Sequence, residues 1–237
     1  MRLLFSDVLV TDENHENHAK HVNIAVIGNT VEYVGEARPE GEFDRVISGN
    51  YLVMPGFYNA HCHSAMTLFR GLGGDLPLKH WLDEAILPAE DRLTPELVRL
   101  FSTEAIAEMI ACGTVAFSDM YFLCTDTARA ALDSGIKLNI ARSVVSFDED
   151  ADPAADYRVA EALELYREWN GEGDGRIKVD FSLHAEYTNT PRMCEYLADL
   201  AHKYDAGMQI HLSETEGEHL RCCLLYTSDA ADDLTRV

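Results

Sequence analysis

The residues of this chain whose types and spacing can do chemistry begin with a pair of histidines. His61 and His63 follow an apolar, strand-like run, YLVMPGF, and stand two positions apart. Residues with this spacing on an extended chain point to the same side, so both imidazoles can bind one metal ion, and Zn²⁺ suits such ligands. Alone the pattern is weak evidence, because neighbouring histidines are also common as solvated side chains or as partners of backbone carbonyls.

Further polar side chains stand in or just after other strand-like runs. His184 follows IKVDFSL, His211 lies in GMQIHL, Arg142 lies in KLNIARSVV, and Glu214 comes three residues after His211. β/α-barrel enzymes build their sites at the carboxyl ends of strands, so these groups are expected at one mouth, where Glu214 could move protons beside an activated water. Three alternatives stay open: core histidines bonded to carbonyls, a structural ion pair for Arg142, and an exposed loop acid at position 214.

The elements that must position these side chains alternate between strands and helices. The five β-type runs cover residues 51–57, 114–122, 137–145, 177–183 and 207–212. Capping side chains before prolines predict helix starts at Thr94-Pro95, Asp152-Pro153 and Thr190-Pro191. Glycines suited to left-handed helix ends stand at Gly113, Gly135, Gly171 and Gly207. This alternation predicts a parallel sheet with helices packed on it.

The spacing of these elements predicts a barrel. Five β/α steps between residues 51 and 213 use about 32 residues each, close to one eighth of the roughly 250 residues of an eight-fold barrel. The expected fold class is α/β, a partial (β/α)8 TIM-like barrel of about the first five β/α units. A doubly wound sheet is the alternative, but the turn after the first strand, NAHCHSAM, lacks glycine-rich phosphate-binding spacing. Residues 1–50 break into β-rich pieces and predict a small all-β region.

Composition and charge exclude several classes of protein. The 237 residues include 19 Lys+Arg and 41 Asp+Glu, a formal charge of −22, and 47% are hydrophobic. A globular core can form, whereas nucleic acid and anionic membrane surfaces are disfavoured as partners. The six cysteines show no CxxC spacing, and no apolar run approaches the ~20 residues of a membrane span or forms a signal-peptide core. We expect a cytoplasmic protein with a small-molecule partner.

A long segment around the two histidines carries a specific resemblance. MPGFYNAHCHSAMTLFRGLGGDLPLKHWLDEAILPAEDRLTPE is similar to the first-strand signature of the amidohydrolase superfamily and, more narrowly, resembles the 5-methylthioadenosine/S-adenosylhomocysteine deaminases. The similarity continues through SDMYF, YREWNG and IHLSETEGE, over nearly all of residues 1–221. It implies a metal-dependent aminohydrolase that converts a thioether adenine nucleoside to the inosine analogue and releases ammonia.

The resemblance also implies roles for particular residues. One divalent zinc ion per subunit is implied on His61, His63 and His211, and Glu214 falls on the family's general acid/base glutamate. Glu90 is implied for the ribose hydroxyls and Trp81 for packing on the substrate, with further contacts from Arg142, Arg158 and His184. A guanine or cytosine deaminase, or a triazine hydrolase, is the enzymatic alternative. A noncatalytic metal-binding fragment is the alternative from outside the enzymes.

The end of the sequence departs from the family pattern. That pattern requires a histidine after a sixth strand and a metal-binding aspartate after an eighth, and neither is present. Residues 222–237, CCLLYTSDAADDLTRV, resemble translated adapter sequence. We therefore expect part of a composite β-sandwich over 1–50, a truncated metal-dependent barrel over 51–221 and a non-native tail over 222–237. On this expectation the chain alone is inactive, and a homo-oligomer of a full-length form stays open.

Overall fold

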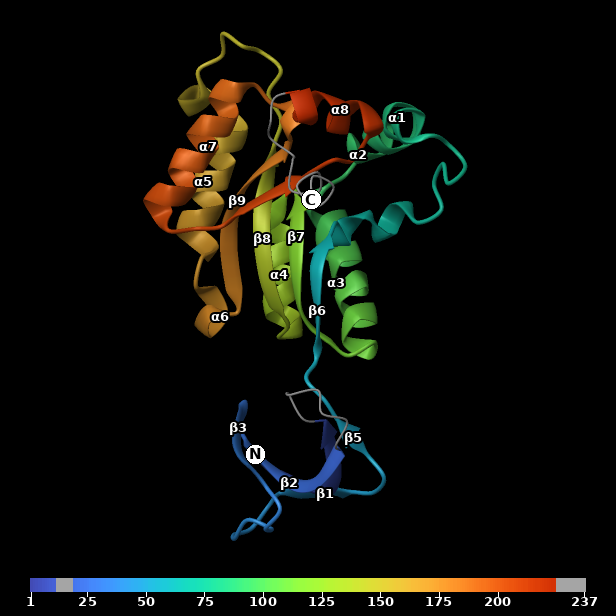
Figure 1. Ribbon diagram of the computed structural model, residues 1–237, viewed down its shortest axis with the longest axis vertical. Helices are drawn as coiled ribbons and strands as arrows, with labels where there is room; N and C mark the ends of the chain where they lie inside the picture. Colours follow the sequence, from blue (N-terminus) through green and yellow to red (C-terminus); the bar gives the residue numbers. More distant parts are fainter. Residues whose placement is uncertain (12–18, 225–237) are drawn as a thin grey trace, which may run out of the picture. The chain divides into compact units, whose positions relative to one another are not determined.

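A computed structural model describes residues 1–11 and 19–224 of the chain (Figure 1). Its backbone contacts divide it into two compact units, Met1–Gly56 and Phe57–Val237. Most of the segment expected to be a non-native tail, residues 225–237, lies outside the described residues.

The first unit is one small sheet. Its strands are β1 (Arg2–Thr11), β2 (Ala19–Ile27), β3 (Thr30–Gly35), β4 (Arg45–Ser48) and β5 (Leu52–Val53). β1 pairs antiparallel with β2 and parallel with β4 and β5, and β2 pairs antiparallel with β3. Val8, Val22 and Ile24 form its core cluster, because alternate residues along a strand point to the same face.

The second unit is built on a parallel sheet. Its strands are β6 (Phe57–Cys62), β7 (Thr114–Tyr121), β8 (Lys137–Val144), β9 (Ile177–Ala185) and β10 (Met208–His211). Their spatial order, β10-β9-β8-β7-β6, is also their order along the chain. Each strand is therefore added beside the previous one, as in a β/α barrel, whereas a doubly wound sheet reverses direction at a switch point. The topology agrees with the predicted five units of a barrel.

Helices connect these strands and pack on one face of the sheet. The long ones are α3 (Pro95–Ala111), α4 (Cys124–Ser134), α5 (Tyr157–Trp169) and α7 (Pro191–Tyr204) (Figure 1). The short ones are α1 (Leu78–His80), α2 (Leu87–Glu90), α6 (Glu172–Gly175), α8 (Glu216–Leu224), the 3₁₀ segments Ser64–Phe69, Pro153–Ala155 and Glu186–Thr188, and the π-helical Trp81–Ile86. One core cluster joins Ile140 and Val179 of the sheet to Ala128 of α4 and Leu165 of α5. No helix in the described ranges is long and apolar enough to cross a membrane.

Side-chain caps explain where three helices begin. Thr94 and Thr190 each accept a hydrogen bond from a backbone N–H of the first turn, so α3 and α7 begin as predicted. The start predicted at Asp152 leads only to a 3₁₀ turn, and α5 begins later, after the capping carboxylate of Asp156.

Gly207 does not end a helix, contrary to the prediction. α7 is ended by Asp205, which itself adopts a left-handed φ of 51°. Gly207 donates its N–H to Asp180 Oδ1 at 2.8 Å, and an added Cβ would lie 2.8 Å from Asp180 Oδ2. Glycine is needed here because the backbone passes directly against a carboxylate.

The run YLVMPGF does not form one strand, which corrects the predicted start of the barrel. Leu52–Val53 pairs as β5 of the first unit, whereas Phe57, the last residue of the run, begins the barrel strand β6. Pro55 lacks the N–H that a ladder needs, so pairing cannot continue through it. As a result His61 lies within the last residues of β6, and His63 follows the strand directly.

Candidate metal centre

Three histidines meet at the carboxyl ends of the sheet. The ring centroids of His61 and His63 are 4.9 Å apart, those of His61 and His211 4.9 Å, and those of His63 and His211 5.1 Å. One donor atom from each side chain lies within 4.8 Å of the other two. β6 and β10 are the two edge strands of the sheet, so their ends can meet only because the sheet curls into an arc. Three imidazole nitrogens on such an arc fit a divalent ion such as Zn²⁺.

The orientation of His63 is fixed by the neighbouring strand. Its Nδ1–H donates to the backbone carbonyl of Met120 in β7 at 2.5 Å, which leaves Nε2 as the nitrogen with a free lone pair. A metal-binding histidine is commonly held in this way, with its second nitrogen bonded to a carbonyl that sets the tautomer. Sequence patterns carry no sign of this bond, because its acceptor is a backbone atom.

The environment of the cluster keeps its imidazoles neutral. Burial lowers the pKa of His63 below its ordinary value of 6.5. Burial and then repulsion from His63 lower the pKa of His61, and burial and then repulsion from neighbouring histidines lower the pKa of His211 to about 4. A neutral imidazole has the lone pair that a metal ion requires, so the cluster is ready for metal near neutral pH.

Replacing His211 with asparagine should make the free energy of unfolding of the metal-free chain depend less on pH between 6.5 and about 4. In the unfolded chain this histidine gains a proton below its ordinary pKa of 6.5, but in the folded chain only near 4, so it costs stability as pH falls from 6.5 to about 4. Urea unfolding across this window, with metal removed by a chelator, measures the free energy of unfolding. His202→Asn on the exposed surface of α7 is the matched control, and identical slopes for wild type and His211→Asn would contradict the expectation.

Glu214 and His184 lie beside the cluster. The His184 ring centroid is 4.9 Å from that of His211, and its Nδ1 is 3.2 Å from Thr188 Oγ1. Glu214 Oε2 accepts a hydrogen bond from the Tyr187 hydroxyl at 2.7 Å, and the charge of this carboxylate raises the pKa of both His63 and His184 against the effect of burial. The structure therefore brings both predicted residues to the mouth.

Glu218, which sequence reasoning missed, holds the backbone of Glu214. Its side chain is fully buried in α8, and its Oε2 accepts a hydrogen bond from the Glu214 N–H at 2.7 Å. Because Tyr187 contacts the Glu214 side chain and Glu218 its main chain, the acid is held at two points.

Asp119 is a second functional candidate that the sequence analysis did not single out. It is completely buried near the end of β7, and its Oδ2 accepts hydrogen bonds from the Ser64 N–H at 3.1 Å and from the Ser64 hydroxyl. Burial raises its pKa to about 6, against the opposing effect of these bonds and of the attraction of His61. An acid inside the otherwise apolar run TVAFSDMYF was the available signal.

Glu90 reaches the edge of the cluster through one intermediary. Its Oε1 accepts a hydrogen bond from the Tyr121 hydroxyl at 2.5 Å, and the Tyr121 ring lies 6.0 Å from that of His63. Burial raises the pKa of Glu90. Trp81 instead donates its indole N–H to the Leu72 carbonyl at 2.8 Å and lines a separate cavity of about 600 Å³.

The two arginines predicted to touch substrate are not brought to the histidines. Arg142 Nε donates to Glu161 Oε2 of α5 at 2.7 Å, so the side chain points into the helix layer. Arg158 pairs with Asp156 Oδ2 at 3.1 Å and lies over the Tyr157 ring, 4.5 Å from its centroid. The structural ion pair left open for Arg142 is what the structure contains, and the substrate roles stay predictions.

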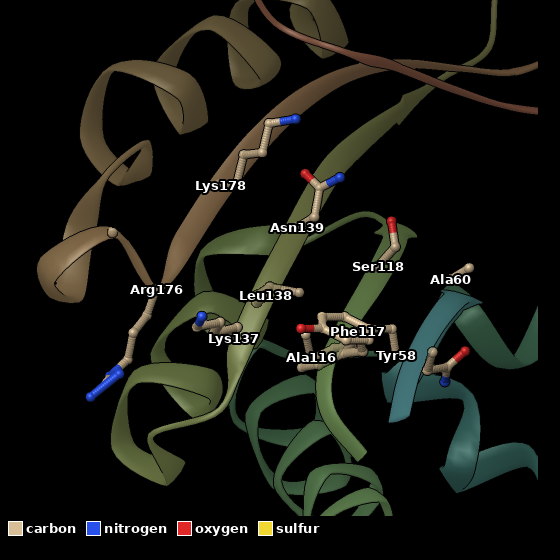
Figure 2. Close-up of a pocket in the computed structure, with 12 residues that line it drawn as sticks. Tyr58, Ala60, Ala116, Phe117, Ser118, Lys137, Leu138, Asn139, Arg176 and Lys178 are labelled. Atoms are coloured by element: carbon tan, nitrogen blue, oxygen red, sulfur yellow. The ribbon is translucent and has the colours of Figure 1, made fainter. Parts of the chain in front are cut away.

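The face of the parallel sheet opposite the helix layer is hollow toward the amino ends of the strands. Figure 2 shows Ser118, Asn139 and Lys178 projecting from three neighbouring strands beside a cavity of about 270 Å³. None of the predicted site residues is among those that line it.

The curled parallel sheet and the histidines at its carboxyl ends define a β/α-barrel protein with a centre suited to a divalent metal. The chain belongs to the amidohydrolase family, whose sequence model matches residues 52–224. The resemblance found in the sequence is thereby confirmed.

Similar proteins include enzymes named in the narrower resemblance. A 5-methylthioadenosine/S-adenosylhomocysteine deaminase of Caldanaerobacter subterraneus subsp. tengcongensis is 38% identical over 219 residues, 92% of this chain and 50% of that protein. A 5'-deoxyadenosine deaminase of Methanobrevibacter smithii is 38% identical over 84% of this chain and 44% of that protein. The chain thus spans about half the length of the curated relatives it matches.

Solved structures agree on the fold. The crystal structure of an adenosine deaminase from Xanthomonas campestris with bound zinc has a TM-score of 0.81 and 29% identity, and the match covers 94% of this chain and 52% of that one. A guanine deaminase from C. acetobutylicum has a TM-score of 0.80 at 19% identity, over 97% of this chain and 57% of that one. The second likeness shows the fold alone.

Proposed function

We propose that this chain supplies three histidine ligands of the metal and the proton-transferring acid of a zinc-dependent deaminase. Its substrate is a thioether adenine nucleoside, 5-methylthioadenosine or S-adenosylhomocysteine, which is hydrolysed to the inosine analogue and ammonia. The observation that carries the proposal is the meeting of three imidazole donors within 4.8 Å from opposite edges of one sheet. The names of the relatives at 37% and 38% identity support the choice of substrate.

The proposed roles follow from the contacts of each residue. His61, His63 and His211 hold one divalent ion per subunit, which when bound supplies Lewis-acid activation of water. Glu214 accepts a proton from the attacking water and passes it to the ring nitrogen N1, as the new C6–O bond forms and the C6–N1 double bond opens. When this adduct collapses to the inosine analogue, Glu214 transfers the second proton of the water to the amino group, the C6–N bond breaks and ammonia leaves. The Tyr187 hydroxyl orients this carboxylate.

The remaining predicted residues form the substrate side of the proposal. Glu90, held by Tyr121, accepts hydrogen bonds from the ribose hydroxyls, and His184 contacts the base beside the metal. Trp81 packs on the substrate. Arg142 and Arg158 would have to leave their acidic partners to reach the substrate. A structure with bound substrate would test these two roles most directly.

The test compares two proteins: the chain alone, and the chain joined to the remaining C-terminal half of the Caldanaerobacter relative. Both are loaded with zinc and assayed for ammonia release from S-adenosylhomocysteine, 5-methylthioadenosine, adenine and guanine. The proposal expects turnover of the two nucleosides by the joined protein. Turnover of guanine or adenine alone would instead favour a free-base deaminase.

Replacing Glu90 with glutamine should discriminate nucleosides from free bases. Losing a charged acceptor for the ribose hydroxyls is expected to lower kcat/KM for S-adenosylhomocysteine about 10-fold or more. A free base has no hydroxyls at this position, so any turnover of adenine should be unchanged. Glu84→Gln, an exposed acid paired with His80, is the matched control. Equal losses for nucleoside and base would contradict the ribose role.

A further inference from the structure

A buried chain of polar side chains begins at Ser64, the residue directly after His63. The Ser64 hydroxyl donates to Asp119 Oδ2 and lies 3.1 Å from Ser102 Oγ, which is itself 3.2 Å from Thr127 Oγ1. These four residues come from the 3₁₀ turn after His63, from β7, from α3 and from α4, and none is more than 3% exposed. Buried polar groups of this kind impose one arrangement on the elements that carry them.

The carboxylate at one end of this chain is only half satisfied. Asp119 Oδ1 is buried and makes no hydrogen bond of good geometry within the described residues, although the neighbouring Met120 N–H lowers the pKa of this carboxyl. None of the ion pairs found there includes Asp119. A buried carboxylate without a counter-charge is costly, and such groups are normally paired, bound to a metal or neutralised by a raised pKa. His61 attracts the Asp119 carboxylate, so the charge of Asp119 acts on the histidine cluster and would act on a cation held there.

The strand that carries Asp119 also controls the ring of a ligand. Asp119 binds the main chain of Ser64, the residue directly after His63, while the next residue, Met120, receives the His63 Nδ1–H on its carbonyl. Two consecutive residues of β7 thus fix both the backbone and the side chain of the HxH segment. Asp119 is not itself among the donor atoms that lie within 4.8 Å of one another.

We propose that Asp119 is a positioning residue of the metal centre, which holds the HxH segment through Ser64 and strengthens cation binding by its buried negative charge. The inference rests on the metal centre of the proposed function and adds a residue that does not touch the metal. Outer partners of metal ligands typically account for about 10- to 100-fold in metal affinity, so a change of this size is expected when the charge is removed.

The experiment measures the Kd for Zn²⁺ of the full 237-residue chain by competition with a chromophoric chelator. Asp119→Asn keeps the size of the side chain and an oxygen that can accept from Ser64 but removes the charge, and it should weaken Zn²⁺ binding about 10- to 100-fold. Asp180→Asn is the matched control: Asp180 is also a buried acid of the sheet, but its partners are Lys178, Asn139 and Gly207. Its variant should keep the wild-type Kd.

Three outcomes separate the ideas. If wild type binds no Zn²⁺ at the cluster, the metal centre of the proposed function fails and the inference fails with it. If wild type binds and Asp119→Asn binds equally well, only the inference is overturned, and Asp119 serves the fold; a lower melting temperature of the metal-free variant with unchanged Kd would be its signature. If Asp119→Asn does not fold, Asp119→Ser replaces it as the test, because it also removes the charge but leaves a smaller side chain that can accept a hydrogen bond, and an unchanged Kd in that variant overturns the inference.

Discussion

Replacing Glu214 with glutamine is expected to lower the deamination rate by a factor of about 10² or more while leaving bound zinc unchanged. General acid–base groups typically contribute about 10² to 10⁴ in rate, and glutamine cannot accept or deliver the proton. The amide oxygen can still accept from the Tyr187 hydroxyl, and the Glu214 N–H can still donate to Glu218, so the loop should keep its position. The loss is therefore assigned to proton transfer rather than to geometry.

The measurement pairs kcat with zinc content in the protein joined to the relative's C-terminal half. Glu216 is an exposed acid at the start of α8, two residues after Glu214. Glu216→Gln is therefore the control and should keep full activity. Loss of zinc from Glu214→Gln would make Glu214 a ligand, and an unchanged kcat would remove it from the chemistry.

Local patterns were sufficient to predict the sheet and most of its helices. The runs that became β7, β8 and β9 were apolar and rich in β-branched residues, and the Thr94-Pro95 and Thr190-Pro191 pairs marked helix starts, because capping and proline act within one turn. Pro55 was the missed local signal, since it separates β5 from β6.

The side of the strand taken by Arg142 could also have been predicted. Leu138, Ile140 and Val144 of β8 are all buried and share its parity, and residues two apart on a strand point to one face. That face packs against helices, so the arginine meets Glu161 there. The position of Arg142 near the end of a strand suggested a site residue, but its side chain lies on the same face of β8 as those buried residues.

The contacts made by Asp119 and Met120 lay beyond the sequence. The bond from His63 ends on a backbone carbonyl 57 positions away, and the bonds from Ser64 to Asp119 span 55 positions. The same holds for His211, which reaches His61 only through the curl of five strands. Sequence patterns specify strands and faces, whereas the curvature that closes the cluster comes from packing of the whole sheet.

Replacing His61 or His63 with alanine is expected to remove zinc and turnover together. Each variant leaves two of the three imidazole donors on the described arc, and two ligands cannot hold an ion in the closed geometry that three define. The variants are made in the protein joined to the relative's C-terminal half. Zinc per chain is measured after gel filtration in chelator, and ammonia release is measured on the same samples. His80→Ala, whose exposed ring pairs with Glu84, is the control. Full zinc content in both ligand variants would remove these histidines from the site.

The same two variants should differ in stability without metal. His63→Ala deprives the Met120 carbonyl, in a residue 1% exposed, of the hydrogen bond from Nδ1, at a cost of about 1 kcal/mol or more. His61 is the more exposed of the two and donates no such bond to β7, so His61→Ala should unfold near the wild-type urea midpoint in chelator. If both variants lost zinc but only His63→Ala lost metal-free stability, the two histidines would have separable roles: both bind the ion, and His63 also fastens the end of β6 to β7. Equal metal-free stability would leave that bond without a part in the fold.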